Sequence, residues 1–175
     1  MKIILTGSQG TGKSTILNHY KEQFPVITEV VRNLSKEGVK INELGDEKGQ
    51  HKIFSTYVKL FKKKNFISDR GLTDVYAYST YHFNQDKLSL NELSYEMGEL
   101  EKLAKEDILW VYFPIEFDVV DDGVRSVDED YRRYIDQAIK QTLDDVGIKY
   151  LTVHGTVGER INQINKYIKE HENRN

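Results

Sequence analysis

A glycine-rich segment near the N-terminus constrains this chain most, because it matches the pattern G-x-x-x-x-G-K-[ST] at every fixed position. The segment reads Gly7-Ser8-Gln9-Gly10-Thr11-Gly12-Lys13-Ser14. It follows a short apolar run at residues 3–5 and opens a stretch with helical periodicity. Glycines allow successive backbone N–H groups to turn inward around phosphate oxygens, and the positive N-terminal end of the next helix adds to that attraction. The chain is therefore expected to bind a nucleoside triphosphate through this phosphate-binding loop.

The side chains of the loop add a charge and a metal ligand to this backbone cradle. Lys13 is expected to reach the β and γ phosphates, which gives it a catalytic role, and the Ser14 hydroxyl is expected to hold Mg²⁺. ATP and Mg²⁺ are therefore the expected cofactors. The residues expected to bind the nucleotide are Gly7, Gln9, Gly10, Thr11, Gly12, Lys13, Ser14 and Thr15.

Short apolar runs alternate with helical patterns along the rest of the chain. Strands are expected at residues 3–5, 26–31, 65–69, 108–113 and 148–153. Helices are expected at residues 13–24, 53–61, 75–82, 93–103, 126–146 and 156–168, and residues 33–49 are expected to form a helix and a loop. Capping boxes of Ser126 with Glu129 and of Thr156 with Glu159 open the last two helices. This alternation predicts an α/β fold with a five-stranded parallel sheet covered by helices on both faces.

Length and composition exclude several classes of protein. A chain of 175 residues is typical of one domain, so residues 1–175 are expected to form a single unit. The absence of cysteine excludes a disulfide scaffold, a thiolate zinc site and a cysteine nucleophile. The apolar N-terminal run is too short for a signal peptide, and no run approaches the roughly 20 apolar residues of a membrane span. A cytoplasmic location without membrane contact is expected.

Asp69 and Arg70 end the third expected strand. Ligands of open α/β sheets collect at the carboxyl ends of the strands, so this pair is expected near the phosphate-binding loop. Asp69 is expected to be catalytic and to hold a Mg²⁺ water or the acceptor, and Arg70 is expected to bind an anionic or polar substrate. The alternative is that Asp69 only caps the helix that follows.

Glu29 and Arg32 end the second expected strand. A carboxylate within an apolar strand is costly unless it is used or paired. Glu29 is expected to orient or deprotonate an acceptor hydroxyl, as a catalytic residue, and Arg32 is expected to contact the acceptor. The alternative is an ordinary Glu–Arg pair at the sheet edge.

An acidic, glycine-bearing segment at residues 116–126 is expected to be a loop. A mobile loop that brings Arg125 to the transferring phosphoryl group would stabilise its charge and exclude water, so Arg125 is expected to be catalytic within a lid at about 115–133. Arg132 and Arg133, on the next helix, are expected to bind the substrate. The alternative is a solvated acidic loop with surface arginines.

Two further signals are weaker. Tyr78 belongs to an aromatic stripe at residues 76–83 and is expected to touch the substrate, with packing in the core as the alternative. His154-Gly155-Thr156 follows the last expected strand, at a place where adenine could be held.

The order of these clusters resembles the small P-loop kinase-like family that includes the nicotinamide riboside kinase domain of bacterial NAD regulators. The Asp69-Arg70 element also looks like the Asp-Arg motif of thymidylate kinases and the acid-Arg-Ser motif of deoxynucleoside kinases. Because Gly71 stands where deoxynucleoside kinases have Ser, the acceptor is not carried over from them. The resemblance extends from residue 2 to about 168. It implies a three-layer P-loop NTPase fold with a small lid, and an enzyme that transfers a phosphoryl group from ATP to a nucleoside, nucleotide or nicotinamide riboside-like acceptor.

Other functions of phosphate-binding loops remain as alternatives. A polynucleotide end kinase, or a non-kinase P-loop ATPase acting on nucleic acid, would use Lys59 and the lysines at residues 62–64 to track a backbone. A motor ATPase of the AAA type is disfavoured, because Pro114 follows the fourth strand where such motors need an Asp–Glu pair. A run of lysines at a helix end is usually a solvated face, so a small-molecule acceptor is preferred over nucleic acid as the partner. The oligomeric state is left open, with a dimer among the options.

Overall fold

Five short apolar runs form strands, and helices connect them. The computed structural model describes residues 1–118 and 128–173. The strands are β1 (Lys2–Thr6), β2 (Val26–Ile27), β3 (Phe66–Ser68), β4 (Leu109–Tyr112) and β5 (Tyr150–Thr152). The helices are α1 (Lys13–Tyr20), α2 (Val30–Lys36), the 3-10 helix η1 (Asn42–Leu44), α3 (Glu47–Leu60), α4 (Leu72–Phe83), α5 (Leu90–Leu103), α6 (Glu129–Asp145) and α7 (Val157–Glu172).

All five strands run parallel in one sheet with the order β2-β3-β1-β4-β5. The central strand β1 pairs with β3 on one side and with β4 on the other, so that Ile4 lies between Ser68 and Trp110. Because the strands are parallel, the segments that follow β1, β2 and β3 all emerge at the same edge of the sheet. This confirms the predicted α/β fold with a five-stranded parallel sheet.

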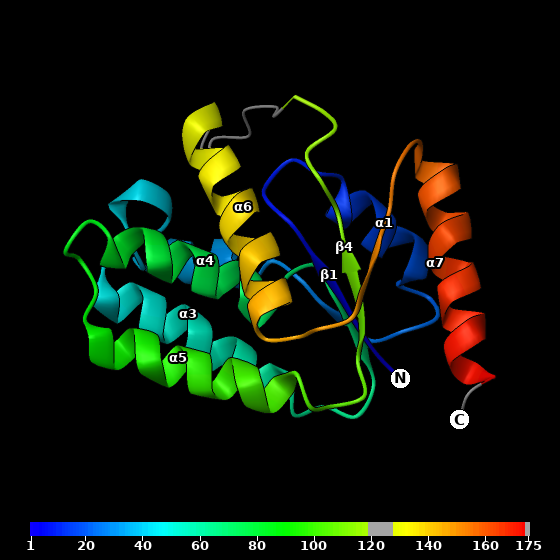
Figure 1. Ribbon diagram of the computed structural model, residues 1–175, viewed down its shortest axis with the longest axis horizontal. Coiled ribbons are helices and arrows are strands. Elements are labelled where there is room, and N and C mark those ends of the chain that lie inside the picture. The colour runs from blue at the N-terminus through cyan, green and yellow to red at the C-terminus, as the bar shows by residue number, and fades with distance from the viewer. Residues whose placement is uncertain (119–127, 174–175) are drawn as a thin grey trace.

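The helices form a layer on each face of this sheet. Figure 1 shows α1 and α7 on one side of β1 and β4, and α3, α4, α5 and α6 on the other. Successive residues of β1 serve the two layers in turn, since Ile4 belongs to the core under α2–α6 and its neighbours Ile3 and Leu5 belong to the core under α1 and α7. The predicted three-layer arrangement is confirmed. None of the helices in the described residues is both long enough and apolar enough to cross a membrane.

The prediction of a second strand at residues 26–31 is wrong beyond Ile27. The chain turns there and enters α2 at Val30, so Glu29 lies at the start of a helix rather than within a strand. Val30, Val31 and Leu34 follow the helical spacing i, i+1, i+4 and pack against the larger core. The β-branched composition of this short run hid the helical face.

Several helix boundaries also differ from expectation; α3, α4 and α5 begin three to six residues earlier, and α7 ends four residues later. The capping box of Thr156 with Glu159 is confirmed, because each residue accepts a hydrogen bond from the other's backbone N–H. Ser126, expected to form a capping box with Glu129, lies outside the described residues, and the N-cap of α6 is Asp128, whose side chain accepts from the backbone N–H of Tyr131. Asp caps helices as well as Ser does, and it lies closer to the helical run. The first helix ends at Tyr20, earlier than expected, where its last carbonyl is closed by turn hydrogen bonds.

A buried carboxyl in α5 makes the stability of this fold depend on pH. Glu96 has no solvent-exposed surface, and burial raises the pKa of its carboxyl to about 8. The native state therefore keeps a proton that the unfolded chain releases above its ordinary pKa of 4.5. The stabilising contribution of this group is complete below pH 4.5 and is lost as the pH rises towards about 8.

The substitution Glu96→Gln keeps the shape of the side chain without a titratable proton. The stability gained by this variant over the wild type is expected to grow from pH 5 to pH 8, by up to about 1.4 kcal/mol for each pH unit. Thermal unfolding at several pH values measures this, with a shift of roughly 2–4 °C for each kcal/mol in a chain of this size. Glu101→Gln, at an exposed position of the same helix, is the matched control and should give a constant difference. A constant difference for Glu96→Gln as well would contradict the prediction.

Candidate functional site

The phosphate-binding loop joins β1 to α1 and is bent by glycines with positive φ. Gly7, Gly10 and Gly12 have φ values of 138°, 70° and 90°. Gly7 is also in close contact with the chain after β4, because a Cβ there would lie 2.4 Å from the carbonyl oxygen of Phe113. A side chain at Gly7 would therefore push the loop away from the sheet edge.

The ammonium of Lys13 lies within the curve of this loop. Its Nζ donates hydrogen bonds to the carbonyl oxygens of Gly7 at 2.5 Å and Ser8 at 2.6 Å, and to Oγ1 of Thr11 at 3.1 Å. Lys13 begins α1, and the residue before it is Gly12, which has no side chain to cap the helix. The first N–H groups of α1 are thus available to an anion beside the lysine charge.

One open cleft of about 150 Å³ brings the loop together with the other clusters. Its walls come from the loop, the start of α2, the end of β3, η1 and two tyrosines. The predicted site residues that line this cleft are Gln9, Gly10, Thr11, Gly12, Lys13, Ser14, Thr15, Glu29, Arg32, Asp69, Arg70 and Tyr78. The roles that the sequence analysis assigns to them stay predictions.

Glu29 has a left-handed backbone, which is uncommon for a residue with a side chain. Its φ is 58°, and its carboxylate forms an ion pair of 2.8 Å with Nε of Arg32. The Glu–Arg pair that sequence analysis gave as the alternative is therefore present, but it lies on the cleft wall. Such strained residues are concentrated at functional sites, where the surrounding structure holds them.

Asp69 and Arg70 line the same cleft as the loop. Asp69 accepts a hydrogen bond of 2.6 Å from Oγ1 of Thr28, which follows β2. It does not cap the next helix, since the N-cap of α4 is Gly71. The guanidinium of Arg70 lies over the ring of Tyr78 at 5.3 Å, and the Tyr78 hydroxyl donates to Oε1 of Gln9 at 2.9 Å.

Asp74 is a central residue that the sequence analysis did not include among its site residues. Its buried carboxylate accepts from the hydroxyl of Thr6 at 2.6 Å and from the N–H groups of Gly7 at 3.2 Å and Gly71 at 2.8 Å. Burial raises the pKa of Asp74, and the nearby charge of Lys13 opposes that rise. Asp74 therefore ties the phosphate-binding loop to the segment that carries Asp69 and Arg70. Acidic residues are common in the first turn of a helix, where they interact favourably with the helix dipole, so the sequence alone does not distinguish Asp74 from such a residue.

The three arginines expected at the lid have different fates. Arg125 lies outside the described residues, as do residues 119–127 of the expected lid. Arg132 is 1% exposed and donates to the carbonyl oxygens of Gln9 and Phe117, so it does not line the cleft. Arg133 is exposed on α6 and does not line the cleft either.

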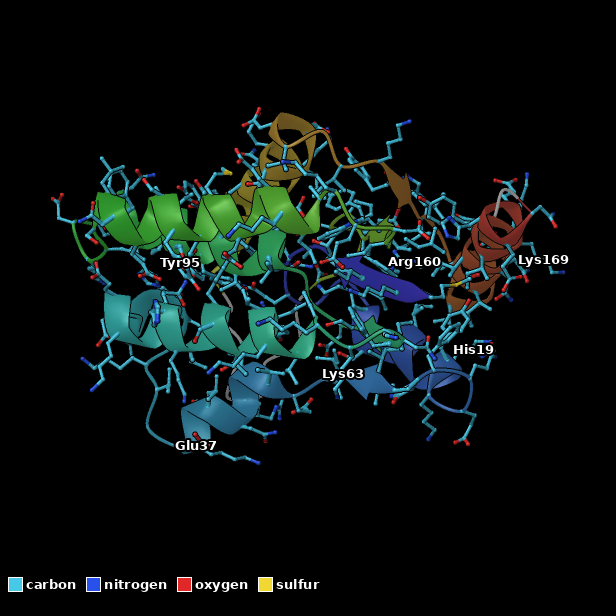
Figure 2. The ribbon with its side chains drawn as sticks, turned by 90° about the horizontal axis from the view of Figure 1, so that it is seen from below. His19, Glu37, Lys63, Tyr95, Arg160 and Lys169 are labelled. Atoms are coloured by element: carbon cyan, nitrogen blue, oxygen red, sulfur yellow. The ribbon has the colours of Figure 1, made fainter. Side chains whose placement is uncertain are left out.

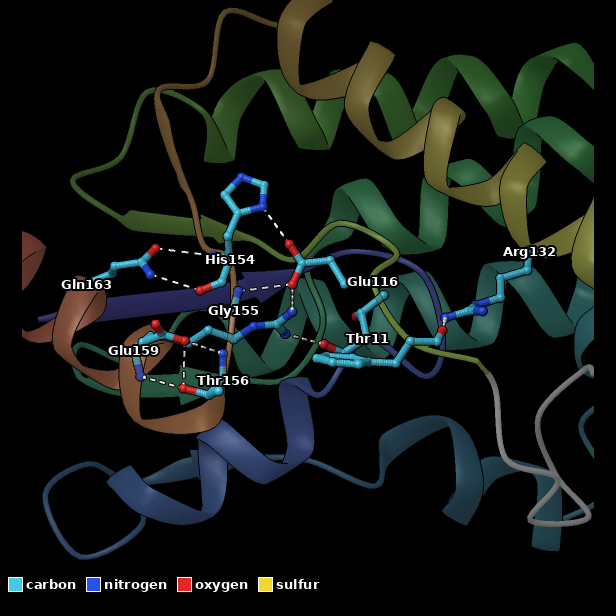
Figure 3. A network of polar contacts seen from close by, with 10 residues as sticks. Thr11, Glu116, Arg132, His154, Gly155, Thr156, Glu159 and Gln163 are labelled. Carbon is cyan, nitrogen blue, oxygen red and sulfur yellow. Dashed lines mark hydrogen bonds and ion pairs between the residues drawn. The ribbon is translucent and has the colours of Figure 1, made fainter.

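A second buried arginine reaches the loop from α7, and sequence analysis missed it. Arg160 donates to the carbonyl oxygen of Thr11 at 2.6 Å and to Oε2 of Glu116 at 2.5 Å. Glu116 also pairs with His154, which follows β5 (Figure 3). Burial opposes the ionised form of Glu116, but the hydrogen bonds from His154 and Arg160 hold its pKa below the usual value. Arginine is normally a surface residue, so no sequence pattern marked this one as buried.

A small recess of about 20 Å³ extends the cleft towards the core, with room for about one water molecule. Its apolar walls include Val31, Ile53 and Val75, and its polar groups include Gln50 and Arg70. The amide of Gln50 is 3% exposed and donates to the hydroxyl of Ser79 at 3.2 Å. This recess also escaped the sequence analysis, because its residues come from separate helices and a loop.

The fold is shared with several solved structures at low sequence identity. NadR protein in complex with NR has a TM-score of 0.73 and 17% identity, and the match covers 95% of this chain and 51% of NadR. Deoxyadenosine kinase from M. mycoides has a TM-score of 0.65 and 17% identity, covering 97% of this chain and 100% of that one. Thymidylate kinase from Candida albicans has a TM-score of 0.68 and 16% identity, covering 99% and 92%. The chain thus spans about half the length of NadR, and at these identities the likeness shows the fold alone.

Sequence comparison gives a family for the chain as well. No curated protein sequence matches it significantly. A family profile described as "AAA domain" matches residues 2–160. The strand β4 is nevertheless followed by Phe113 and Pro114 rather than by the acidic pair of a motor ATPase. Because the profile covers far more than half of the chain, the chain belongs to this AAA domain family, and its fold is the P-loop kinase fold that it shares with the deoxyadenosine and thymidylate kinases.

Proposed function

We propose that this protein transfers the terminal phosphoryl group of ATP to a hydroxyl of a small nucleoside-like acceptor, a class that includes nicotinamide riboside. The observation that carries this proposal is the shared cleft, which is lined by the phosphate-binding loop together with two carboxylates and two arginines. Positioning and charge stabilisation supply most of the catalysis in phosphoryl transfer, so this set of groups suffices.

The loop side of the cleft fits a triphosphate with its metal. Backbone N–H groups and Lys13 would hold the phosphates, and the exposed hydroxyl of Ser14 would hold Mg²⁺ with help from Asp69. Two side chains are enough for this ion, because Mg²⁺ at phosphate sites is usually bound by one or two side chains and by the phosphates themselves. When bound, Mg²⁺ would neutralise charge that develops on the phosphate oxygens. Arg125 remains a predicted catalytic residue in this scheme, and Arg133 a predicted substrate contact.

The rest of the cleft would hold an acceptor that carries a ring. Its wall combines the apolar side chains of Val31, Ile41 and Tyr57 with a few polar groups, which is typical of sites for flat organic molecules. Glu29, on the cleft wall, would orient the acceptor hydroxyl and accept its proton, while Arg32, Arg70 and Tyr78 would hold the acceptor. The names of the structural relatives, a deoxyadenosine kinase and a thymidylate kinase, also favour a nucleoside or nucleotide as the acceptor.

The lysines that could track a nucleic acid lie away from this cleft. Lys59 lies in the last turn of α3, and the lysines at residues 62–64, of which Figure 2 labels Lys63, precede β3, which places them at the amino ends of the strands. The phosphate-binding loop is at the opposite, carboxyl edge of the sheet, and none of these lysines lines the cleft. A small acceptor is therefore favoured over a polynucleotide end.

Replacing Lys13 by alanine is expected to lower kcat by at least about a hundredfold, because a charge aimed at the transferring group is removed. ADP release can be followed with a panel of nucleosides, nucleoside monophosphates and nicotinamide riboside. Lys21→Ala, at an exposed position just beyond α1, is the matched control and should turn over normally. A folded Lys13→Ala protein with near-wild-type turnover would end the kinase proposal.

A pair of variants decides the class of acceptor. If the acceptor is a hydroxyl, Glu29→Gln is expected to lower kcat by roughly 10²–10⁴-fold, and Arg70→Ala is expected to impair turnover by misplacing the acceptor. If the acceptor is a monophosphate, Arg70→Ala should mainly raise the KM for the acceptor, and Glu29→Gln should be tolerated. Steady-state kinetics on the best acceptor of the panel separate the two. Full activity of Glu29→Gln on a nucleoside would refute the role of Glu29 and leave Asp69 as the carboxylate to test.

A further inference from the structure

Two buried arginines from helices on opposite faces of the sheet reach the same phosphate-binding loop. Arg132 of α6 is 1% exposed and Arg160 of α7 is 2% exposed. Nε of Arg132 donates to the carbonyl oxygen of Gln9 at 3.0 Å, and Nη1 of Arg160 donates to the carbonyl oxygen of Thr11 at 2.6 Å. Figure 3 labels Arg132 and Thr11, and a dashed line marks the hydrogen bond that the carbonyl oxygen of Thr11 accepts from Arg160.

Peptide geometry links these carbonyl groups to the phosphate side of the loop. The described peptide bonds are trans, so the C=O of one residue and the N–H of the next point in opposite directions. When Gln9 and Thr11 direct their carbonyls towards the buried arginines, the N–H groups of Gly10 and Gly12 point the other way. Both glycines line the cleft.

We propose that Arg132 and Arg160 are positioning residues that hold the peptide units 9–10 and 11–12 with their N–H groups turned towards a bound polyphosphate. Neither arginine lines the cleft, so each acts through the backbone of the loop. This assigns Arg132 a role different from the substrate contact that the sequence predicts. The inference rests on the proposed binding of a nucleoside triphosphate by the loop, but not on the identity of the acceptor.

The two guanidinium groups have the same kinds of partner, a carboxylate and a carbonyl oxygen of the loop. Each pairs with one carboxylate, Arg132 with Glu129 at 3.0 Å and Arg160 with Glu116 at 2.5 Å. A buried charge without partners would be costly, and each carboxylate offsets part of that cost. Each guanidinium then directs a further N–H at a carbonyl of the loop, and a charged donor polarises the peptide unit so that its N–H becomes a stronger donor.

Phe117 connects the two arginines. Its carbonyl oxygen accepts from Nη2 of Arg132 at 2.6 Å, and its ring lies against the guanidinium of Arg160 at 4.9 Å. The ring of Phe113 lies against the same guanidinium at 5.5 Å. The segment after β4 thus fixes the orientation of both groups, which is what positioning of a loop carbonyl requires.

Inorganic tripolyphosphate tests this inference, because it has the charged chain of a nucleoside triphosphate but no base, sugar or acceptor. Isothermal titration calorimetry on the full chain should show a Kd at least about tenfold higher for Arg160→Met, a change of about 1.4 kcal/mol. Arg160→Lys keeps the charge, but one ammonium cannot replace a planar fork that reaches Thr11 and Glu116 together, so its Kd should also rise, by less.

Backbone amide NMR gives a readout that a general loosening of the fold would not produce. Arg160→Lys is expected to move the amide resonance of Gly12 more than that of Gly10. Arg132→Lys is expected to do the reverse, because it holds the carbonyl of Gln9. This reciprocal pattern also decides the matter if Arg160→Met fails to fold.

Two control variants on α7 separate the loop contact from the charge and the packing of the helix. Lys166→Met removes a charge from an exposed position, and Ile164→Val trims a fully buried side chain. Both are expected to bind tripolyphosphate as the wild type does. Equal weakening by Ile164→Val and Arg160→Met, or unmoved Gly10 and Gly12 resonances, would overturn the inference. Normal tripolyphosphate behaviour in a protein that phosphorylates no acceptor would instead refute the proposed function alone.

Discussion

The site depends on one buried carboxylate that joins three segments of the chain. Asp74 accepts hydrogen bonds from the end of β1, from the first residue of the phosphate-binding loop and from the start of α4. These bonds fix the position of the loop that carries Lys13 relative to the segment that carries Asp69 and Arg70. A carboxylate without exposed surface is tolerated only because hydrogen-bond donors and nearby cations surround it. Loss of these donors would release both walls of the cleft at once.

The sequence predicts most of the fold because its signals are local. The alternation of short apolar runs with helical spacing is enough to predict a parallel sheet with two helical layers. The error at β2 arises where the signal is shortest, since a two-residue edge strand gives no period to read. There the packing of Val30 and Val31 against the core decides the conformation, and such packing is a tertiary effect.

The site was predicted in unequal parts for a similar reason. Residues that follow a strand within one or two positions, such as Glu29 after β2 and Asp69 after β3, could be grouped because topology brings the carboxyl ends of all strands to one edge. The buried Arg160 and the recess residue Gln50 could not, since each owes its place to contacts between elements far apart in the chain. Sequence reasoning assigned Arg132 to the substrate because a cation beside a phosphate site suggests direct contact, whereas burial gives it a backbone partner.

The folded-back position of Lys13 has a consequence for the energetics of binding. Lys13 is 8% exposed and its ammonium is already bonded to oxygens of Gly7, Ser8 and Thr11, so most of the hydration shell of the ammonium is lost when the chain folds. An ammonium that stayed in water would have to shed that shell for each ligand. Here an incoming phosphate oxygen exchanges places with a protein oxygen, and the dehydration of the lysine no longer weighs against binding. The affinity of this lysine for an anion then depends on how much more strongly its ammonium hydrogen-bonds to a charged phosphate oxygen than to the neutral protein oxygen that is displaced.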